Sequence, residues 1–103
     1  MKYKVYFLDE AENDLDESYV WYEIQKINLG DEFIININQS VNNISENPFH
    51  CEEVYKNIRK KIVSKFPFLI YYYIEQEKKE IKIIAVLHAK RNPKIWKTRI
   101  HNF

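Results

Sequence analysis

The sequence is poor in the residues that several large functional classes require. Its 103 residues include one glycine, one cysteine and three prolines. The single glycine, Gly30, excludes the glycine-rich loops with which nucleotide-binding folds hold phosphates. The single cysteine, Cys51, cannot form an internal disulfide, which is typical of a reducing compartment. No run approaches the ~20 apolar residues of a membrane helix and residues 1–8 lack a signal-peptide pattern, so we expect a cytoplasmic protein without a membrane partner.

Charge is distributed unevenly along the chain, although the net charge is only +1. Residues 1–55 hold 12 acidic and 3 basic side chains, whereas residues 56–103 hold 3 acidic and 13 basic ones. The length predicts a single domain over residues 1–103, with an acidic helical side and a basic sheet side. A basic face favours nucleic acid or an acidic protein as partner. The alternative is a solvated surface whose two halves attract each other across the fold.

Two amphipathic helices are predicted in the acidic half. The first begins at Asp9 and ends near Gly30, which would take the left-handed cap conformation. The second begins near Asp31 and is stopped by Pro48. Each has one buried stripe with helical spacing, formed by Ala11, Leu15, Tyr19 and Tyr22 in the first helix and by Phe33, Ile37, Val41 and Ile44 in the second. The short break between them predicts an antiparallel pair.

Strands are predicted on both sides of this helix pair. β-branched and aromatic residues mark them at 3–8, 58–64, 68–76 and 81–88, and residues 53–55 form a short strand or the start of a longer one. A short helix is predicted to begin at Pro93. The order β-α-α-β-β-β(-α) predicts an α+β fold, with two antiparallel helices packed on one face of a small, largely antiparallel twisted sheet.

Candidate functional residues gather where the last predicted strand ends. The strand stops at His88, and Lys90, Arg91 and Trp96 follow around an Asn-Pro break. His88 is either a general base or target contact, or a histidine satisfied by a neighbouring backbone group. Arg91 either contacts phosphate or an acidic target, or pairs with an acid of the first helix. Trp96 is expected to be a packing residue with a partial role in a partner surface.

Further candidates lie on the strand over residues 58–64. Arg59 and Lys61 share one strand face by alternation, and we expect them to form the floor of an open basic face, with Lys60 on the other face or at an edge. The tyrosine run splits in the same way, with Tyr72 opposite to its two neighbours. His50 and Cys51 are adjacent, but two neighbouring ligands without a second pair do not make a zinc site. We expect neither a metal nor a cofactor.

Several short motifs together resemble the ParE/RelE superfamily of bacterial toxins from type II toxin–antitoxin systems. They are Ala11 with Asp14-Leu15, Ile58-Arg59, Phe66-Pro67-Phe68 with Ile70-Tyr71-Tyr72, and Val86 to Pro93 with Trp96. The resemblance covers nearly the whole chain. It implies a compact toxin, neutralised in a hetero-oligomer by a small cognate antitoxin with an extended or helical C-terminal segment. RelE-like members cleave mRNA in the ribosomal A site, whereas ParE-like members poison DNA gyrase.

The resemblance also helps to choose between these two activities. RelE-like nucleases use lysines on the second strand, an arginine at the start of the third, and an arginine and a tyrosine near the C-terminus. Lys60, Lys61 and Arg91 match three of these positions, but Phe68 and Trp96 stand at the other two. Cleavage by 2′-OH attack needs proton transfer and cations on the phosphate. Because Phe68 and Trp96 depart from the RelE-like pattern, the resemblance favours a ParE-like protein that inhibits DNA gyrase by binding.

Two alternatives remain beside the gyrase inhibitor. Under the preferred interpretation, the target-binding residues are Arg59, Lys61, His88, Lys90, Arg91 and Trp96. The first alternative is a RelE-like, ribosome-dependent mRNA endoribonuclease, in which the candidate catalytic residues are His88, Arg91 and Lys61. The second is a family member that retains only antitoxin binding.

Overall fold

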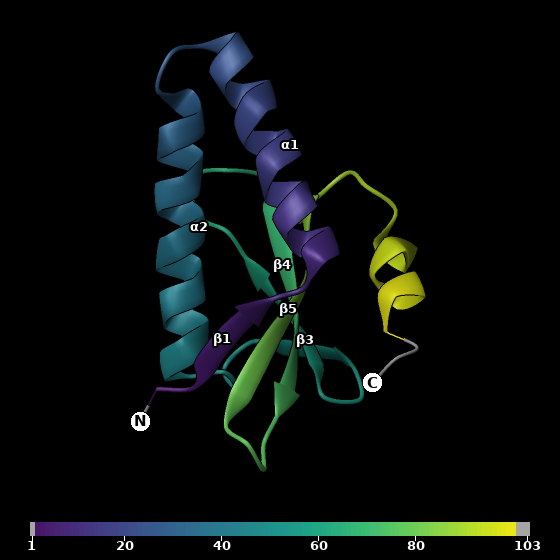
Figure 1. Ribbon diagram of the computed structural model, residues 1–103. Helices are drawn as coiled ribbons and strands as arrows, with labels where there is room; N and C mark the ends of the chain where they lie inside the picture. Colours follow the sequence, from purple (N-terminus) through teal and green to yellow (C-terminus); the bar gives the residue numbers. More distant parts are fainter. Residues whose placement is uncertain (1, 101–103) are drawn as a thin grey trace.

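Two antiparallel helices cover one face of a five-stranded sheet (Figure 1). The computed structural model describes residues 2–100. The predicted fold class and element order are confirmed. The elements are β1 (Lys4–Phe7), α1 (Asp9–Gln25), α2 (Leu29–Glu46), β2 (Glu52–Tyr55), β3 (Ile58–Ile62), β4 (Phe68–Glu75), β5 (Glu80–His88) and the 3-10 helix η1 (Pro93–Arg99).

The sheet has the strand order β1-β5-β4-β3-β2. β1 runs parallel to β5, and the other neighbours pair antiparallel. A β-bulge interrupts the pairing of the two central strands, because Tyr71 faces Ala85 whereas Tyr72 faces Ile83. Ile84 is therefore the extra residue of β5, and such a residue increases the local twist and re-aims the strand that follows it. The segment re-aimed here ends at His88.

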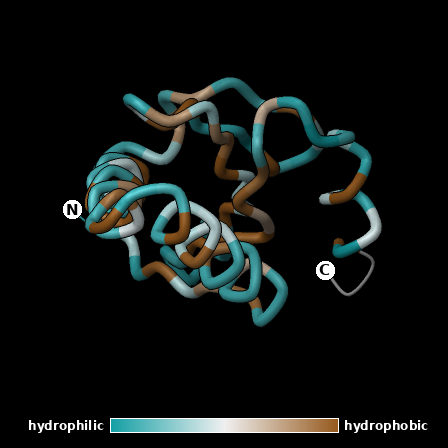
Figure 2. Tube along the Cα trace, turned by 90° about the horizontal axis from the view of Figure 1, so that it is seen from above, coloured by the Kyte–Doolittle hydropathy of each residue, from teal (hydrophilic) through white to brown (hydrophobic). Residues whose placement is uncertain are grey.

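Apolar side chains fill both faces of the sheet, and Figure 2 shows hydrophobic residues along the strands at the centre of the molecule. The helix-side core consists of Ala11, Phe33, Ile37, Ile44, Val63, Phe68, Ile70, Tyr72, Ile74, Ile81, Ile83 and Val86. A smaller cluster on the opposite face lies under η1 and consists of Ile58, Tyr71, Ile84, Ala85, Leu87 and Trp96. The predicted split of the tyrosine run is confirmed, since Tyr72 belongs to the first cluster and its neighbours to the second.

The prediction for Gly30 as a left-handed cap is wrong. The left-handed residue between the helices is Asn28, with φ 73°, whereas Gly30 lies in the first turn of α2. A Cβ atom on Gly30 would come within 2.7 Å of the Tyr19 carbonyl oxygen, so glycine is required for the close approach of the helices. The Glu23 carboxylate accepts hydrogen bonds from the N–H groups of Asn28 (3.3 Å), Gly30 (2.9 Å) and Asp31 (3.3 Å). It thereby satisfies orphan donors at the start of α2.

An ion pair closes the part of the β5 edge that β1 leaves open. β1 pairs with β5 only as far as Ile83. Beyond that point Asp14 Oδ2 accepts a hydrogen bond from the Val86 N–H (2.9 Å), and Arg99 Nη1 donates to the Ile84 carbonyl (3.1 Å). The two side chains also pair with each other, with Nη1 2.7 Å from Oδ2 and Nη2 3.2 Å from Oδ1. We call this arrangement the edge clamp, and it ties α1, β5 and η1 together.

Candidate functional site

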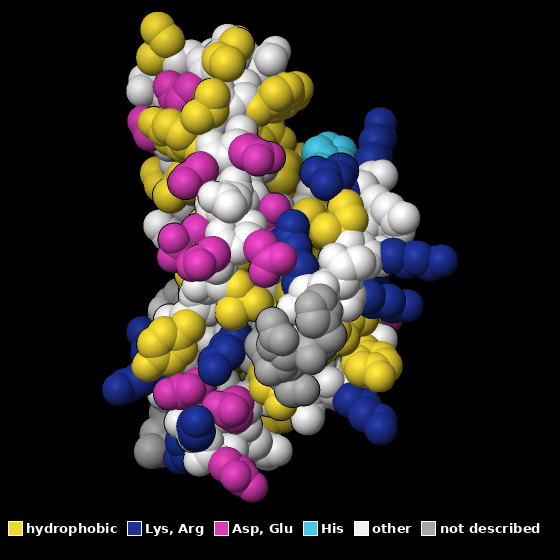
Figure 3. Space-filling view, turned by 45° about the vertical axis from the view of Figure 1, so that its right-hand side comes forward, with side chains coloured by type: hydrophobic (Ala, Val, Ile, Leu, Met, Phe, Trp, Pro, Cys, Tyr) yellow, Lys and Arg dark blue, Asp and Glu magenta, His cyan; other side chains and the backbone are white. Residues whose placement is uncertain are grey.

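A cleft of about 370 Å³ opens between α1 and the sheet, where β4 begins and β5 ends. α1 supplies one wall and the two strands supply the other. The residues that line the cleft are Glu17, Ser18, Trp21, Tyr22, Phe68, His88 and Arg91. Two residues singled out from the sequence, His88 and Arg91, thus meet in one place. Figure 3 shows a histidine and neighbouring Lys and Arg side chains on this side of the molecule.

His88 is held in a defined orientation at the end of β5. Its Nδ1 accepts a hydrogen bond from the Lys90 N–H (3.1 Å), and its ring meets the edge of Phe68 at a centroid distance of 5.4 Å. In a neutral imidazole one nitrogen accepts and the other carries the proton. Because Nδ1 accepts, the proton lies on Nε2. The predicted backbone partner at the strand end is confirmed, and one donor is left for a ligand.

Arg91 is exposed, and it makes no ion pair or hydrogen bond through its side chain within residues 2–100. The alternative that it pairs with an acid of the first helix is wrong, because Arg99 occupies that position on Asp14 and lies 3.9 Å from Glu10. Its backbone N–H donates to the His88 carbonyl (2.9 Å), which forms a tight turn after β5. Arg91 is therefore a cation at the mouth of the cleft that is available to a partner.

The α1 wall of the cleft was not anticipated from the sequence. Trp21 is 58% exposed and meets Tyr22 edge to face at 5.1 Å. The ring of Tyr22 in turn lies 6.1 Å from that of Phe68, and burial raises the pKa of its phenol. Trp21 lies outside the buried stripe of its helix, and that position is the signal that could have marked it as a surface residue. The cleft thus combines an aromatic wall with a cation and an imidazole donor.

The prediction that Arg59 and Lys61 form an open basic floor is wrong, because both lie on the helix side of the sheet. Arg59 pairs in register with Tyr72, a residue of the helix-side core. Its Nη1 donates to the carbonyls of Phe49 (3.1 Å) and Cys51 (2.6 Å). The guanidinium also lies 5.4 Å from the centroid of the Phe49 ring. Arg59 therefore fastens the loop between α2 and β2.

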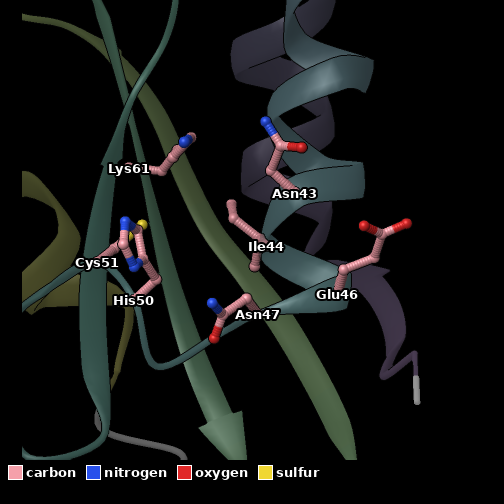
Figure 4. A pocket seen from close by; sticks show the side chains of 7 residues that line it. All are labelled: Asn43, Ile44, Glu46, Asn47, His50, Cys51 and Lys61. Carbon is pink, nitrogen blue, oxygen red and sulfur yellow. The ribbon is translucent and has the colours of Figure 1, made fainter.

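Lys61 lines a second cleft, of about 290 Å³, between β3 and the end of α2 (Figure 4). Figure 4 shows Lys61 on the strand, across from the helix residues Asn43 and Ile44. The remaining lining residues are Glu46, Asn47, His50 and Cys51. This cleft shares no residue with the one at His88. Within residues 2–100, no three His, Cys, Asp or Glu side chains are placed to hold a metal ion.

The opposite face of the sheet carries Lys60, and Trp96 of η1 packs on it. Lys60 pairs in register with Tyr71 and lies 3.7 Å from Glu52. The ring of Trp96 is 3% exposed and stacks on Tyr71 at a centroid distance of 5.7 Å and an interplanar angle of 22°. The predicted packing of Trp96 is confirmed, and η1 covers this part of the face.

No helix within residues 2–100 has the length and apolar character to cross a membrane.

Two solved toxin–antitoxin structures contain a chain with this fold. A chain of the chromosomal ParDE system from P. aeruginosa superposes with a TM-score of 0.72 and 16% identity, over 84% of this chain and 96% of that one. A chain of the RelBE2 toxin–antitoxin complex from Mycobacterium tuberculosis superposes with a TM-score of 0.59 and 15% identity, over 85% and 99%. At these identities the similarity defines the fold, which is one found in toxin–antitoxin complexes.

The family follows from the sequence comparison. The family described as ParE toxin of type II toxin–antitoxin system, parDE, matches residues 5–93. Because this match spans most of the 103 residues, the chain belongs to the ParE toxin family. None of the curated proteins compared with the chain matches it significantly.

Proposed function

We propose that this ParE-type toxin inhibits DNA gyrase by binding to it, and that a cognate antitoxin neutralises it in a cytoplasmic hetero-oligomer. Family membership supports the toxin and its antitoxin. The cleft at His88 supports a contact site, because it presents an imidazole donor, a cation and an exposed tryptophan together. Tryptophan and arginine are enriched where binding energy concentrates in protein interfaces.

The observation that carries this proposal is the burial of Phe68 and Trp96. Phe68 is 6% exposed and packs on Phe33 at a centroid distance of 4.8 Å, and Trp96 is 3% exposed against Tyr71. A RelE-like nuclease would place a cation and an ionisable hydroxyl at these two positions. Buried apolar rings neither stabilise the charge on a phosphate nor exchange protons with oxygen. Binding without chemistry on the target is the function that agrees with these two residues.

Purified protein is expected to inhibit supercoiling by gyrase or to trap cleaved DNA, and to leave mRNA intact on programmed ribosomes. Arg91→Ala should weaken inhibition at least about tenfold, because an interface arginine that contributes about 1.4 kcal/mol or more changes affinity by that factor. The matched control is Lys78→Ala, which removes the same charge from the turn at the far end of β4, where the lysine pairs with Glu75 on the surface. Equal loss in both variants would contradict a contact at the cleft.

One arrangement in the cleft favours the nuclease as a second candidate. Glu17, His88 and Arg91 line the same space, so a carboxylate, an imidazole and a cation could act as base, acid and phosphate ligand. Site-specific cleavage of mRNA in the A site that is lost in His88→Ala would move the protein to the nuclease branch. The double assay on gyrase and on ribosomes therefore decides between the two functions.

Expression of the chain alone is expected to arrest growth, and co-expression of the small protein encoded beside it should restore growth. An acidic C-terminal segment in that protein would complement the basic half of the toxin. The Arg91→Ala chain, produced at the same soluble level, is the matched control and should arrest growth less. Normal growth under verified soluble expression would count against an active toxin. A salt titration of the co-purified complex measures how much charge attraction contributes to antitoxin binding, because salt screens exposed ionic contacts.

A further inference from the structure

The C-terminal part of the chain carries cations that no acidic residue neutralises. After Glu80 the sequence contains neither aspartate nor glutamate. The exposed lysine and arginine side chains at the end of β5 and on η1 make no ion pair within residues 2–100, and they are Lys90, Arg91, Lys94 and Lys97. Figure 3 shows Lys and Arg side chains along the right-hand edge of the molecule, whereas most Asp and Glu side chains in that view lie over the helices.

The geometry of η1 places three of these cations in a row. A 3-10 helix has three residues per turn, so side chains at i and i+3 eclipse, and each step of three residues rises about 6 Å. Lys94 and Lys97 are three residues apart on η1, and Arg91 lies one further step back, in the turn before it. We call these three residues the basic row. Trp96 and Arg99 form a different row of the same helix, which faces the sheet, because their side chains are 3% and 12% exposed.

The basic row is held in place before any partner arrives. The Asn92 side chain accepts a hydrogen bond from the Lys94 N–H (2.9 Å), and the Arg91 N–H donates to the carbonyl of the last residue of β5 (2.9 Å). Lys97 Nζ lies 5.7 Å from the centroid of the Trp96 ring. Because these contacts already order the backbone of the row and one of its side chains, binding costs less conformational entropy.

We propose that the basic row binds the phosphate backbone of duplex DNA without reading its sequence. Lysine and arginine neutralise DNA phosphates, and the step along the row is similar to the separation of successive phosphates on one strand. Contacts to phosphates position a protein but carry no sequence information. The choice of DNA over RNA rests on the proposed function, since gyrase acts on duplex DNA, whereas the binding itself is a property of the chain alone.

The surroundings of the basic row argue against two other occupants. An acidic protein would need apolar anchors, because charged residues are depleted at the centre of protein interfaces, and the large apolar ring of η1, Trp96, is buried. Single-stranded nucleic acid would need a series of exposed rings on which successive bases stack. Within residues 2–100 the exposed ring that adjoins η1 is Tyr55, which is 53% exposed and lies 6.3 Å from the Trp96 ring. Cations without such a series of rings fit the backbone of a duplex.

A short labelled DNA duplex tests the proposal on the purified chain, with anisotropy as the measurement at low ionic strength. Two duplexes of unrelated sequence should bind with equal affinity. The logarithm of the association constant should fall against the logarithm of the salt concentration with a slope of about −3, because each of three phosphate contacts contributes about −0.9. No binding, a slope near zero, or a preference of about tenfold or more for one sequence would overturn the proposal.

Variants distinguish the basic row from the net charge of the chain. Lys94→Ala with Lys97→Ala should weaken binding at least about tenfold and make the salt slope shallower by about 2, since each lost phosphate contact removes about 1. Lys94→Arg with Lys97→Arg should retain both the affinity and the slope. The matched control is Lys26→Ala with Lys78→Ala, which removes two exposed lysines from loops outside η1 and should change neither. Equal losses in the two alanine pairs would overturn the site.

Competition experiments distinguish duplex DNA from other polyanions. Polyglutamate matched in charge should displace the labelled duplex only at a concentration at least about tenfold higher than that of unlabelled duplex. Displacement at equal or lower concentration would make an acidic protein the occupant, and tighter binding of single-stranded DNA or of an RNA duplex would make that ligand the occupant. Each of these results would overturn duplex DNA. If the duplex binds as expected but gyrase is not inhibited, the proposed function fails and the basic row stands.

Discussion

Asp14→Ala is expected to lower the free energy of unfolding by about 3–5 kcal/mol, the range for removing one partner of a buried ion pair. Asp14 and Arg99 are each 12% exposed in their side chains. Without the carboxylate the guanidinium loses its bidentate partner, and the Val86 N–H loses its acceptor at the open part of the β5 edge. The hydrogen bond that Arg99 donates to Asp14 raises the pKa of the guanidinium, and arginine stays protonated in proteins without such a partner, so the variant would leave a half-buried charge unpaired. Urea unfolding measures the loss.

Asp16→Ala is the matched control for the edge clamp. Asp16 is an exposed aspartate two residues further along α1, and surface substitutions of this kind change stability by within about 0.5 kcal/mol. Asp14→Asn keeps an oxygen that can accept from Val86 and should fall between Asp14→Ala and the native chain. Equal unfolding midpoints for Asp14→Ala and Asp16→Ala would contradict a stabilising clamp.

Trp96→Ala is expected to lower the free energy of unfolding by about 3–5 kcal/mol, as for other large aromatic truncations in cores. The ring is 3% exposed and stacks on Tyr71, so its loss leaves a cavity under η1 and exposes the second cluster. Trp96→Phe keeps an aromatic ring on Tyr71 and should retain most of the stability. Thermal and urea unfolding of the three proteins measure both effects.

Trp21→Ala is the matched control for this substitution, because the same residue type lies in a different environment. Trp21 is 58% exposed and contacts Tyr22 at its edge, so its removal should cost at most about 1 kcal/mol, within the usual range of a surface aromatic contact. If Trp96→Ala had the same melting temperature as the native protein, the ring would lie on an accessible surface rather than in the smaller cluster under η1.

The edge clamp and Trp96 also bear on the cleft, because Trp96 fixes the middle of η1 and Arg99 fixes its C-terminal end. Asn92 caps η1 by accepting from the Lys94 N–H (2.9 Å), and the Arg91 N–H donates to the His88 carbonyl (2.9 Å). The turn that presents Arg91 is thus held between β5 and η1. If Asp14→Ala weakens gyrase inhibition, the variant and the native chain have to be compared at a temperature at which the variant is folded.

The sequence by itself determined the order of the helices and strands, and which residues lie on the same face of one of them. The helical spacing of Ala11, Phe33 and Ile37 predicted side chains that the structure buries completely, because burial of one stripe requires that period. Alternation placed Arg59 and Lys61 on one strand face, and their register partners Tyr72 and Ile70 agree. These features follow from local backbone geometry, which repeats at fixed intervals along the chain.

Only the tertiary structure decided which face is covered and which distant residues meet. Alternation does not say which side of the sheet the helices take, so Arg59 and Lys61 were expected on the open face and lie on the helix side. Asp14 and Arg99 are 85 residues apart, and Trp21 joins His88 and Arg91 across the same fold. Contacts of this kind depend on how α1 and η1 dock on the sheet, because local geometry leaves the pairing of distant surfaces open.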